Sequence, residues 1–199
     1  GYQCTRVSAP LDWAEPDSGA IEIAVKRLPA SGSAERRIGS LLINPGGPGG
    51  SGVDRLAGIV DRVIGPDVRA AYDVVSFDPR GVGQSSAVTC GDDAALTDAY
   101  FTYDADIDNQ ADLDRARTRV RLFGRACLAA TGPLLGEVDT VSSAHDLDLL
   151  RAVLGDAQLH YVGFSYGTFL GASYADLYPQ NVSRMVLDGA LDPSQSMDD

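Results

Sequence analysis

The sequence predicts an α/β fold with a mostly parallel sheet that is covered by helices on both faces. Two observations predict this class. Short apolar runs rich in β-branched residues alternate with longer runs of helical periodicity, and the strand-like runs are apolar enough to be buried. In addition, 44% of the 199 residues are hydrophobic and 22% are charged, which is typical of a globular chain with a buried core.

The expected elements follow one another in a regular order. A hairpin of two strands comes first, and single strands and helices then alternate. The expected strands are residues 5–11, 20–28, 40–43, 73–77, 159–162 and 184–187, and the expected helices are residues 53–63, 111–130, 143–154 and 166–178. We interpret residues 1–199 as part of one domain, with an acidic excursion at about residues 91–115.

The most informative motif is the pentapeptide Gly163-Phe164-Ser165-Tyr166-Gly167, which lies between a strand-like run and a helix-like run. The pattern Gly-x-Ser-x-Gly at such a junction predicts a nucleophile elbow, a sharp turn that exposes a serine hydroxyl. Glycine is expected at both ends because a side chain there would collide with the helix or the strand. The alternative is a loop without chemistry, but the flanking strand and helix favour the elbow.

A glycine-dense turn with the sequence NPGGPGGSG, residues 44–52, follows the strand expected at residues 40–43. Such a turn lets backbone N–H groups approach a ligand without obstruction by side chains. In acyl transfer these groups form an oxyanion hole with the N–H of the residue after the nucleophile, here Tyr166. A phosphate-binding loop is disfavoured because the turn has two prolines and no lysine. A flexible linker is also disfavoured, because the turn directly follows a buried strand.

A third turn, with the sequence DPRGVGQS, covers residues 78–85 and follows the strand expected at residues 73–77. Asp78 and Arg80 are candidates for catalysis. A fixed Asp and Arg in a turn more often form hydrogen bonds with the backbone and brace the neighbouring loop. We therefore predict that both residues are structural.

The four segments NPGGPGGSG, FDPRGVGQS, GFSYGT and YPQNVSRMVLDGALDP together resemble the α/β-hydrolase fold. More narrowly, they resemble the secreted bacterial tripeptidyl aminopeptidases, which are relatives of proline iminopeptidase. The resemblance runs from residues 7–13 almost to the end of the chain. It implies that Ser165 is the nucleophile, that Gly47 or its neighbour Gly46 supplies one oxyanion N–H, and that Tyr166 supplies the other.

The resemblance covers an N-terminal half of such enzymes. Members of this family are much longer and carry a lid after the sixth strand, and their triad Asp and His lie in these later parts. In the α/β-hydrolase order the serine precedes the Asp and the His. A sheet that stops at the sixth strand would also expose an apolar edge with unpaired backbone groups. We therefore expect this chain to be one piece of a longer enzyme.

Two histidines and two aspartates are the local candidates to complete a triad. His145 falls in the first turn of the helix expected at residues 143–154, where protonation is disfavoured, and His160 lies on the strand before the elbow. Both histidines are predicted to be structural. Asp188 and Asp192 follow the sixth strand, but neither can complete a triad without a histidine to orient.

Cys90 and Cys127 flank the acidic excursion, and Cys127 lies on the helix expected at residues 111–130. A disulfide between them would close a long loop and contribute about 4 kcal/mol of stability on the chain-entropy model. This pairing fits an extracellular protein, and the alternative is two buried free thiols. The third cysteine, Cys4, would then need a partner beyond residue 199.

The net charge of −12 argues against binding to nucleic acid and to anionic membrane surfaces. No run of residues approaches the length of a membrane span. Eight aspartates lie between residues 92 and 114, and they could bind a cationic amine, although a solvated excursion is the more common meaning of such a run. No spacing typical of a metal site appears, and no cofactor is implied.

The resemblance and the motifs together predict a serine exopeptidase that releases short peptides, tripeptides in this family, from free N-termini. Its partners would be a peptide substrate and the C-terminal remainder of the same enzyme. Its location would be secreted or in the cell envelope. Two alternatives stay open, namely an esterase or amidase acting on small acyl substrates and an inactive fragment that lacks the triad Asp and His.

Overall fold

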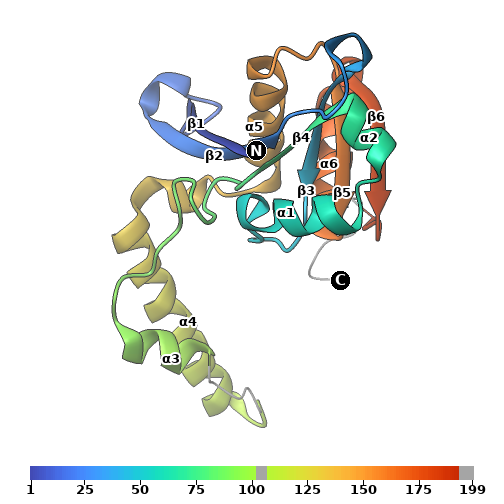
Figure 1. Cartoon of the computed structure of the whole chain (residues 1–199). Helices are drawn as coiled ribbons and strands as arrows, with labels where there is room; N and C mark the ends of the chain where they lie inside the picture. The colour runs from blue at the N-terminus through green and yellow to red at the C-terminus, as the bar shows by residue number, and fades with distance from the viewer. Residues whose placement is uncertain (102–106, 193–199) are drawn as a thin grey trace. The chain divides into compact units, whose positions relative to one another are not determined.

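The computed structural model describes residues 1–101 and 107–192. The chain divides into two compact units, Gly1–Ser86 with Val138–Asp199, and Ala87–Glu137. The first unit holds the sheet and most of the helices, and the second is a helical excursion (Figure 1). No helix in these described parts of the chain combines the length and the apolarity needed to cross a membrane.

Six strands form one sheet in the order β1-β2-β4-β3-β5-β6. The strands are β1 (Gln3–Pro10), β2 (Ala20–Leu28), β3 (Gly39–Asn44), β4 (Tyr72–Phe77), β5 (Leu159–Phe164) and β6 (Val182–Asp188). β1 and β2 form the expected hairpin, and β2 pairs antiparallel with β4. β4, β3, β5 and β6 are parallel, which confirms the predicted fold class.

The helices of the first unit lie on both faces of the sheet. They are α1 (Gly52–Arg62), α2 (Pro66–Ala71), α5 (Thr140–Val153) and α6 (Tyr166–Leu177). On β5, Val162 packs with the cluster that contains Leu56 of α1, whereas the hydroxyl of Tyr161 donates to the carbonyl of Gly167 on α6. Neighbouring strand residues point to opposite faces, so α1 and α6 cover opposite faces, as predicted (Figure 1).

β6 is the last strand at its end of the sheet, and each of its residues is either half-buried or exposed. The side chain of Val186 is 58% exposed. Among the described residues, no strand pairs with the outer side of β6. An apolar groove of about 340 Å³ opens beside this strand, and Val63, Tyr72 and Phe164 contribute to its lining.

The second unit contains α3 (Ala94–Phe101) and α4 (Gln110–Thr131). Asp93 directly precedes α3, and its carboxylate accepts the backbone N–H of Leu96, as an N-cap residue does. The sequence predicts α4 but not α3, and the acidic excursion expected at about residues 91–115 falls within the range of this unit. Residues 102–106 of that stretch lie outside the described residues.

A disulfide joins Cys90 to Cys127, which is the pair that the sequence predicts. The bridge ties the segment before α3 to the last part of α4. Cys4 on β1 is a free, exposed cysteine.

Candidate active site

Ser165 lies at the junction between β5 and α6, and its backbone has a φ of 52°. It is the one non-glycine residue with a positive φ among the described residues. A left-handed conformation costs energy in a residue with a Cβ atom, and it persists only where the surrounding structure imposes it. The side chain of Ser165 is exposed. This geometry is that of the predicted nucleophile elbow.

Hydrogen bonds to β6 and α6 hold the turn around Ser165 in place. The N–H of Ser165 donates to the carbonyl of Asp188 at 2.9 Å. The carbonyl of Ser165 accepts from the N–H of Thr168 at 2.8 Å and from its hydroxyl at 2.6 Å. The Thr168 hydroxyl oxygen also accepts the N–H of Leu191 at 3.0 Å. The end of β6 therefore supports the turn through its backbone.

The two glycines of the motif stand where the backbone of another element comes close. A Cβ atom at Gly163 would collide with the carbonyl of Gly167, and one at Gly167 would lie 2.7 Å from the carbonyl oxygen of Asn44. The first obstacle belongs to α6 and the second to β3. This confirms the steric reason for glycine at both positions.

Replacing Gly167 by alanine is expected to lower the free energy of unfolding by about 2 kcal/mol, because the Asn44 carbonyl is fixed in β3 and cannot yield. Urea unfolding measures the change. Gly58→Ala is the matched control, because Gly58 lies within α1 and a Cβ atom there meets nothing within 4 Å. The control should gain about 0.5 kcal/mol or more from helix propensity. Equal stability of Gly167→Ala and the native chain would contradict the steric account.

The glycine-dense turn at residues 44–52 packs directly against the elbow. A Cβ atom at Gly46 would lie 3.1 Å from the Cβ of Ser165. Gly46 and Gly47 both have a positive φ, of 87° and 131°. The fold therefore brings together the two turns that the sequence singles out, although more than a hundred residues separate them.

The backbone N–H groups of the two turns differ in whether they are already bonded. The N–H of Gly46 donates to the side-chain oxygen of Asn44 at 2.9 Å. None of the described residues accepts a hydrogen bond from the N–H of Gly47. Tyr166 is the first residue of α6, where an N–H has no partner within the helix. The N–H groups of Gly47 and Tyr166 are therefore both available to donate to a ligand.

The ring of Tyr166 is tied to the start of α5. Its hydroxyl lies 2.8 Å from the hydroxyl of Thr140, the first residue of that helix. Burial raises the pKa of the Tyr166 hydroxyl, so this group is a neutral phenol at physiological pH. The contact fixes the orientation of the residue that follows Ser165.

Asp78 braces the far end of the glycine-dense turn. The carboxylate is fully buried and accepts from the Ser51 hydroxyl at 2.7 Å and from the Val53 N–H at 3.0 Å. Its second oxygen accepts the N–H of Gln84 at 2.7 Å. Asp78 thus joins two loops through hydrogen bonds, which confirms its predicted structural role.

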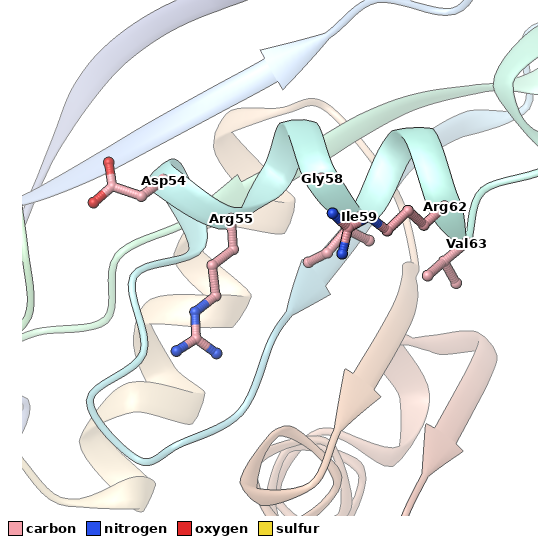
Figure 2. A pocket seen from close by; sticks show the side chains of 6 residues that line it. All are labelled: Asp54, Arg55, Gly58, Ile59, Arg62 and Val63. Atoms are coloured by element: carbon pink, nitrogen blue, oxygen red, sulfur yellow. The ribbon is translucent and has the colours of Figure 1, made fainter.

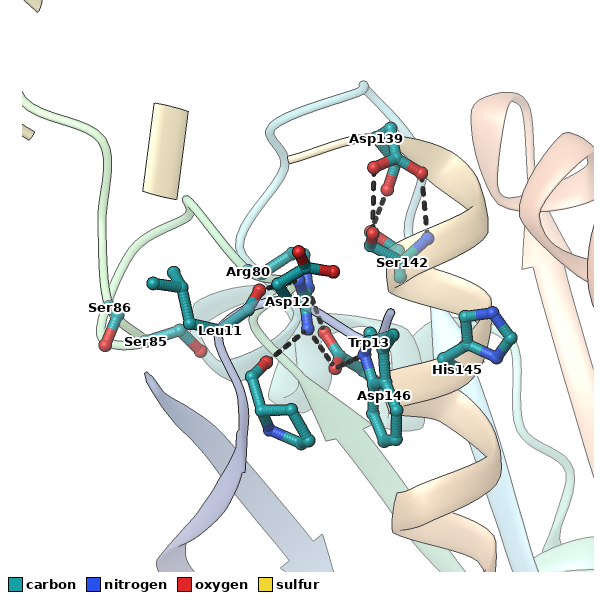
Figure 3. A network of polar contacts seen from close by, with 12 residues as sticks. Leu11, Asp12, Trp13, Arg80, Ser85, Ser86, Asp139, Ser142, His145 and Asp146 are labelled. Carbon is teal, nitrogen blue, oxygen red and sulfur yellow. Dashed lines mark hydrogen bonds and ion pairs between the residues drawn. The ribbon is translucent and has the colours of Figure 1, made fainter. Parts of the chain in front are cut away.

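Arg80 forms a buried ion pair with Asp146 of α5 (Figure 3). Two guanidinium nitrogens donate to the two carboxylate oxygens, each at 2.7 Å. Arg80 also donates to the carbonyls of Leu11 and Pro10, and the indole N–H of Trp13 donates to Asp146 at 3.1 Å. Burial raises the pKa of Asp146, and the bonds from Arg80 oppose that rise. Arg80 is structural, as predicted, but nothing in the sequence pattern indicates Asp146 as its partner.

His145 lies near the C-terminal end of α6, whereas Ser165 lies at the N-terminal end, so His145 is too far away to act as a base for Ser165. Its ring packs between Trp13 and Tyr178, at centroid distances of 5.4 Å and 5.7 Å, and its Nδ1 contacts the hydroxyl of Tyr178. Tyr178 follows the last residue of α6, whereas Ser165 precedes the first. A helix of 12 residues is about 18 Å long, so His145 is structural, as predicted.

His160 is also far from the serine. It lies on β5 five residues before Ser165, which corresponds to about 16 Å along a strand. Its ring packs edge-on against Tyr72 at 5.1 Å. Burial, and then the nearby Arg184, lowers the pKa of this histidine. His145 and His160 are the only two histidines of the sequence, and both lie too far from Ser165 to act as its base.

A pocket along α1 is lined by residues outside both turns (Figure 2). Its lining residues are Asp54, Arg55, Gly58, Ile59, Arg62 and Val63. They supply no nucleophile and no histidine. Within the described residues, no group of three or more His, Cys, Asp or Glu side chains could hold a metal ion.

A family model described as the α/β hydrolase fold matches residues 39–199. Among curated proteins, the chain is 40% identical over 194 residues to a tripeptidyl aminopeptidase of Streptomyces lividans, and this match covers 97% of the chain and 36% of that protein. It is 39% identical to serine protease Hip1 and 40% identical to carboxylesterase B, both of Mycobacterium tuberculosis. Each of these two matches covers 98% of the chain and 37% of the relative. The chain thus spans little more than a third of the length of these relatives.

A solved structure shows the same fold at low sequence identity. A probable hydrolytic enzyme from Pseudomonas aeruginosa PAO1 matches with a TM-score of 0.54 and 16% identity. This match covers 94% of the chain and 41% of that structure. At this identity the likeness concerns the fold alone.

Proposed function

The chain belongs to the α/β-hydrolase family, and on that basis we propose that it is the nucleophile-bearing part of a serine exopeptidase. Ser165 attacks the scissile carbonyl, and the N–H groups of Gly47 and Tyr166 bind the oxyanion. The observation that carries this proposal is the left-handed backbone of Ser165, packed against a turn in which the Gly47 N–H has no acceptor among the described residues. The relatives named tripeptidyl aminopeptidase and serine protease favour peptides as substrates.

The base and its orienting carboxylate come from a further portion of polypeptide in this proposal. Neither His145 nor His160 can reach Ser165, and a serine needs such a base to become a nucleophile. The relatives are long enough to supply that portion, since the chain spans 36–37% of them. The outer side of β6, which no strand of the described residues pairs with, and the apolar groove beside it suit the docking of the same portion.

A comparison of peptides with free and acetylated N-termini tests the exopeptidase assignment. The enzyme assembled from this chain and its C-terminal portion should cleave a tripeptide anilide with a free amine about 10²-fold faster than the acetylated form. The acetyl group removes the charge that a site for free N-termini must recognise. Equal rates for the two substrates would refute the exopeptidase assignment and leave a less selective hydrolase.

The second candidate function is an esterase acting on small acyl substrates, which the likeness to carboxylesterase B favours. Both functions use the same serine and the same oxyanion donors, so the elbow does not separate them. An assembled enzyme that cleaves p-nitrophenyl acetate but none of the tripeptide anilides is an esterase.

We also propose that the protein works in an oxidising compartment, outside the cell or in its envelope. The disulfide between Cys90 and Cys127 supports this location, because such bonds persist in oxidising surroundings.

A further inference from the structure

We propose that Asn44 is a positioning residue that assigns the oxyanion hole to Gly47 by engaging the N–H of Gly46. The inference rests on the proposed function, in which the turn at residues 44–52 binds the oxyanion. It adds a residue that neither the elbow motif nor the glycine pattern indicates.

Asn44 is a buried polar residue that touches both turns. It is the last residue of β3 and is 1% exposed. Its side-chain oxygen accepts the N–H of Gly46 at 2.9 Å. A Cβ atom at Gly167 would lie 2.7 Å from the carbonyl oxygen of Asn44 and 2.9 Å from its side-chain oxygen. The residue thus contacts the glycine-dense turn on one side and the first turn of α6 on the other.

The bond to Asn44 decides which of two adjacent N–H groups is available. The N–H of Gly46 is already bonded inside the protein, so it cannot also stabilise a new charge at full strength. The N–H of Gly47, next along the chain, has no acceptor among the described residues. The bond also holds the peptide plane before Gly46, and the positive φ of Gly46 then directs the chain onward to Gly47. A donor fixed in advance is what an oxyanion hole needs.

The identity of the side chain matters because asparagine is a neutral acceptor. Aspartate would accept the same N–H bond and would fit the same space. Its negative charge would then lie beside the position where the oxyanion develops, and it would oppose that charge. Because Asn44 is 1% exposed, a charge at this position would also lower the free energy of unfolding. In the fraction of protein that remains folded, a purely structural turn would keep the native kcat with aspartate, whereas a turn that binds an oxyanion would not.

The test compares Asn44→Asp, Asn44→Ala and Asn109→Asp in the enzyme assembled from this chain and its C-terminal portion. Asn44→Asp should lower kcat by about 10²-fold or more at neutral pH, with KM changed by less than about threefold. This loss, measured relative to the native enzyme at each pH, should shrink as the pH falls and the introduced carboxylate takes up a proton. Asn44→Ala should lose a similar factor that does not depend on pH.

Asn109→Asp is the matched control for the change of charge. Asn109 caps α4 in the second unit by accepting the N–H of Asp112, and aspartate caps helices equally well. This variant should keep the native kcat. A native kcat in Asn44→Asp would overturn the inference, as would a loss that appears in KM alone or that does not change with pH.

Amide hydrogen exchange gives a readout that does not depend on activity or on the Asn44 variants. In the unliganded Ser165→Ala protein the N–H of Gly46 should be protected and that of Gly47 should exchange freely. The opposite pattern would overturn the inference. Undiminished activity of Ser165→Ala would instead refute the proposed function, so the two failures are distinguishable.

Discussion

Ser165→Ala is expected to lower kcat by about 10⁶-fold in the enzyme assembled from this chain and its C-terminal portion. The loss is large because the hydroxyl forms the covalent intermediate, and no other group at the turn can replace it. The substitution should leave the fold intact, since the contacts that hold the turn come from the backbone of Ser165 and from Thr168. Steady-state kinetics with a free-amine tripeptide anilide measures the change.

Ser173→Ala on the same helix is the control for this prediction. The hydroxyl of Ser173 donates to the carbonyl of Phe169 within α6, away from the elbow. Its removal should change kcat by less than about twofold, because the hydroxyl only supplements a helical carbonyl that is already bonded. A loss under tenfold in Ser165→Ala would contradict the assignment of Ser165 as the nucleophile.

Arg80→Met is expected to lower the free energy of unfolding by about 3–5 kcal/mol. The ion pair of Arg80 with Asp146 is buried, with side-chain exposures of 0% and 1%. Removing the arginine leaves a buried carboxylate without its counter-charge, and it also removes the donors to the carbonyls of Pro10 and Leu11. Urea unfolding can be followed by the fluorescence of Trp13, the only tryptophan of the sequence, which itself donates to Asp146.

The stability deficit of Arg80→Met, which is its loss in free energy of unfolding relative to the native chain, should decrease as the pH falls. Without the arginine, burial holds the folded-state pKa of Asp146 above its unfolded value. A group with a raised folded pKa contributes its stability below the unfolded pKa, and that contribution is lost as the pH rises through the folded pKa. The deficit should therefore shrink as the pH falls toward about 4. A deficit that grows on acidification would contradict this account.

Two variants show whether the cost arises from the unpaired charge. The double variant Arg80→Met with Asp146→Leu removes both charges and should recover most of the lost stability. Arg117→Met breaks the exposed pair with Asp114, which is 3.8 Å apart, and should cost less than about 1 kcal/mol. If Arg80→Met, the double variant and Arg117→Met all lowered the free energy of unfolding by the same amount, the burial of the Arg80 pair would not be the cause of the loss.

The sequence predicts the sheet well because each strand is a short run between turn residues, and the central strands β3 and β4 are buried along their whole length. All six expected strands and all four expected helices are found within a few residues of the expected bounds. The short helices α2 and α3 escape prediction because neither has a long apolar stripe. α2 has only 6 residues and begins at Pro66, and α3 lies in a stretch of the sequence that is rich in aspartate.

The candidate site is predicted in part, for a physical reason. Ser165 and its flanking glycines follow from one short motif, since the local turn imposes those residue types. The role of Asn44 depends on which N–H group its side chain reaches, and the partner of Arg80 lies 66 residues away on α5. The pairing of Arg80 comes from the tertiary fold, so neither periodicity nor spacing indicates it. The bond to Asn44 is local, but its role depends on the fold, which brings this turn beside Ser165.

The central claim is that Ser165 is an activated nucleophile once the C-terminal portion is present. A fluorophosphonate probe tests it most directly, because this reagent modifies only serines that a base has activated. Intact mass spectrometry of the assembled enzyme, followed by peptide mapping, should show one adduct on the peptide that contains Ser165 and none in Ser165→Ala. An assembled, folded enzyme with no adduct at Ser165 would contradict the account.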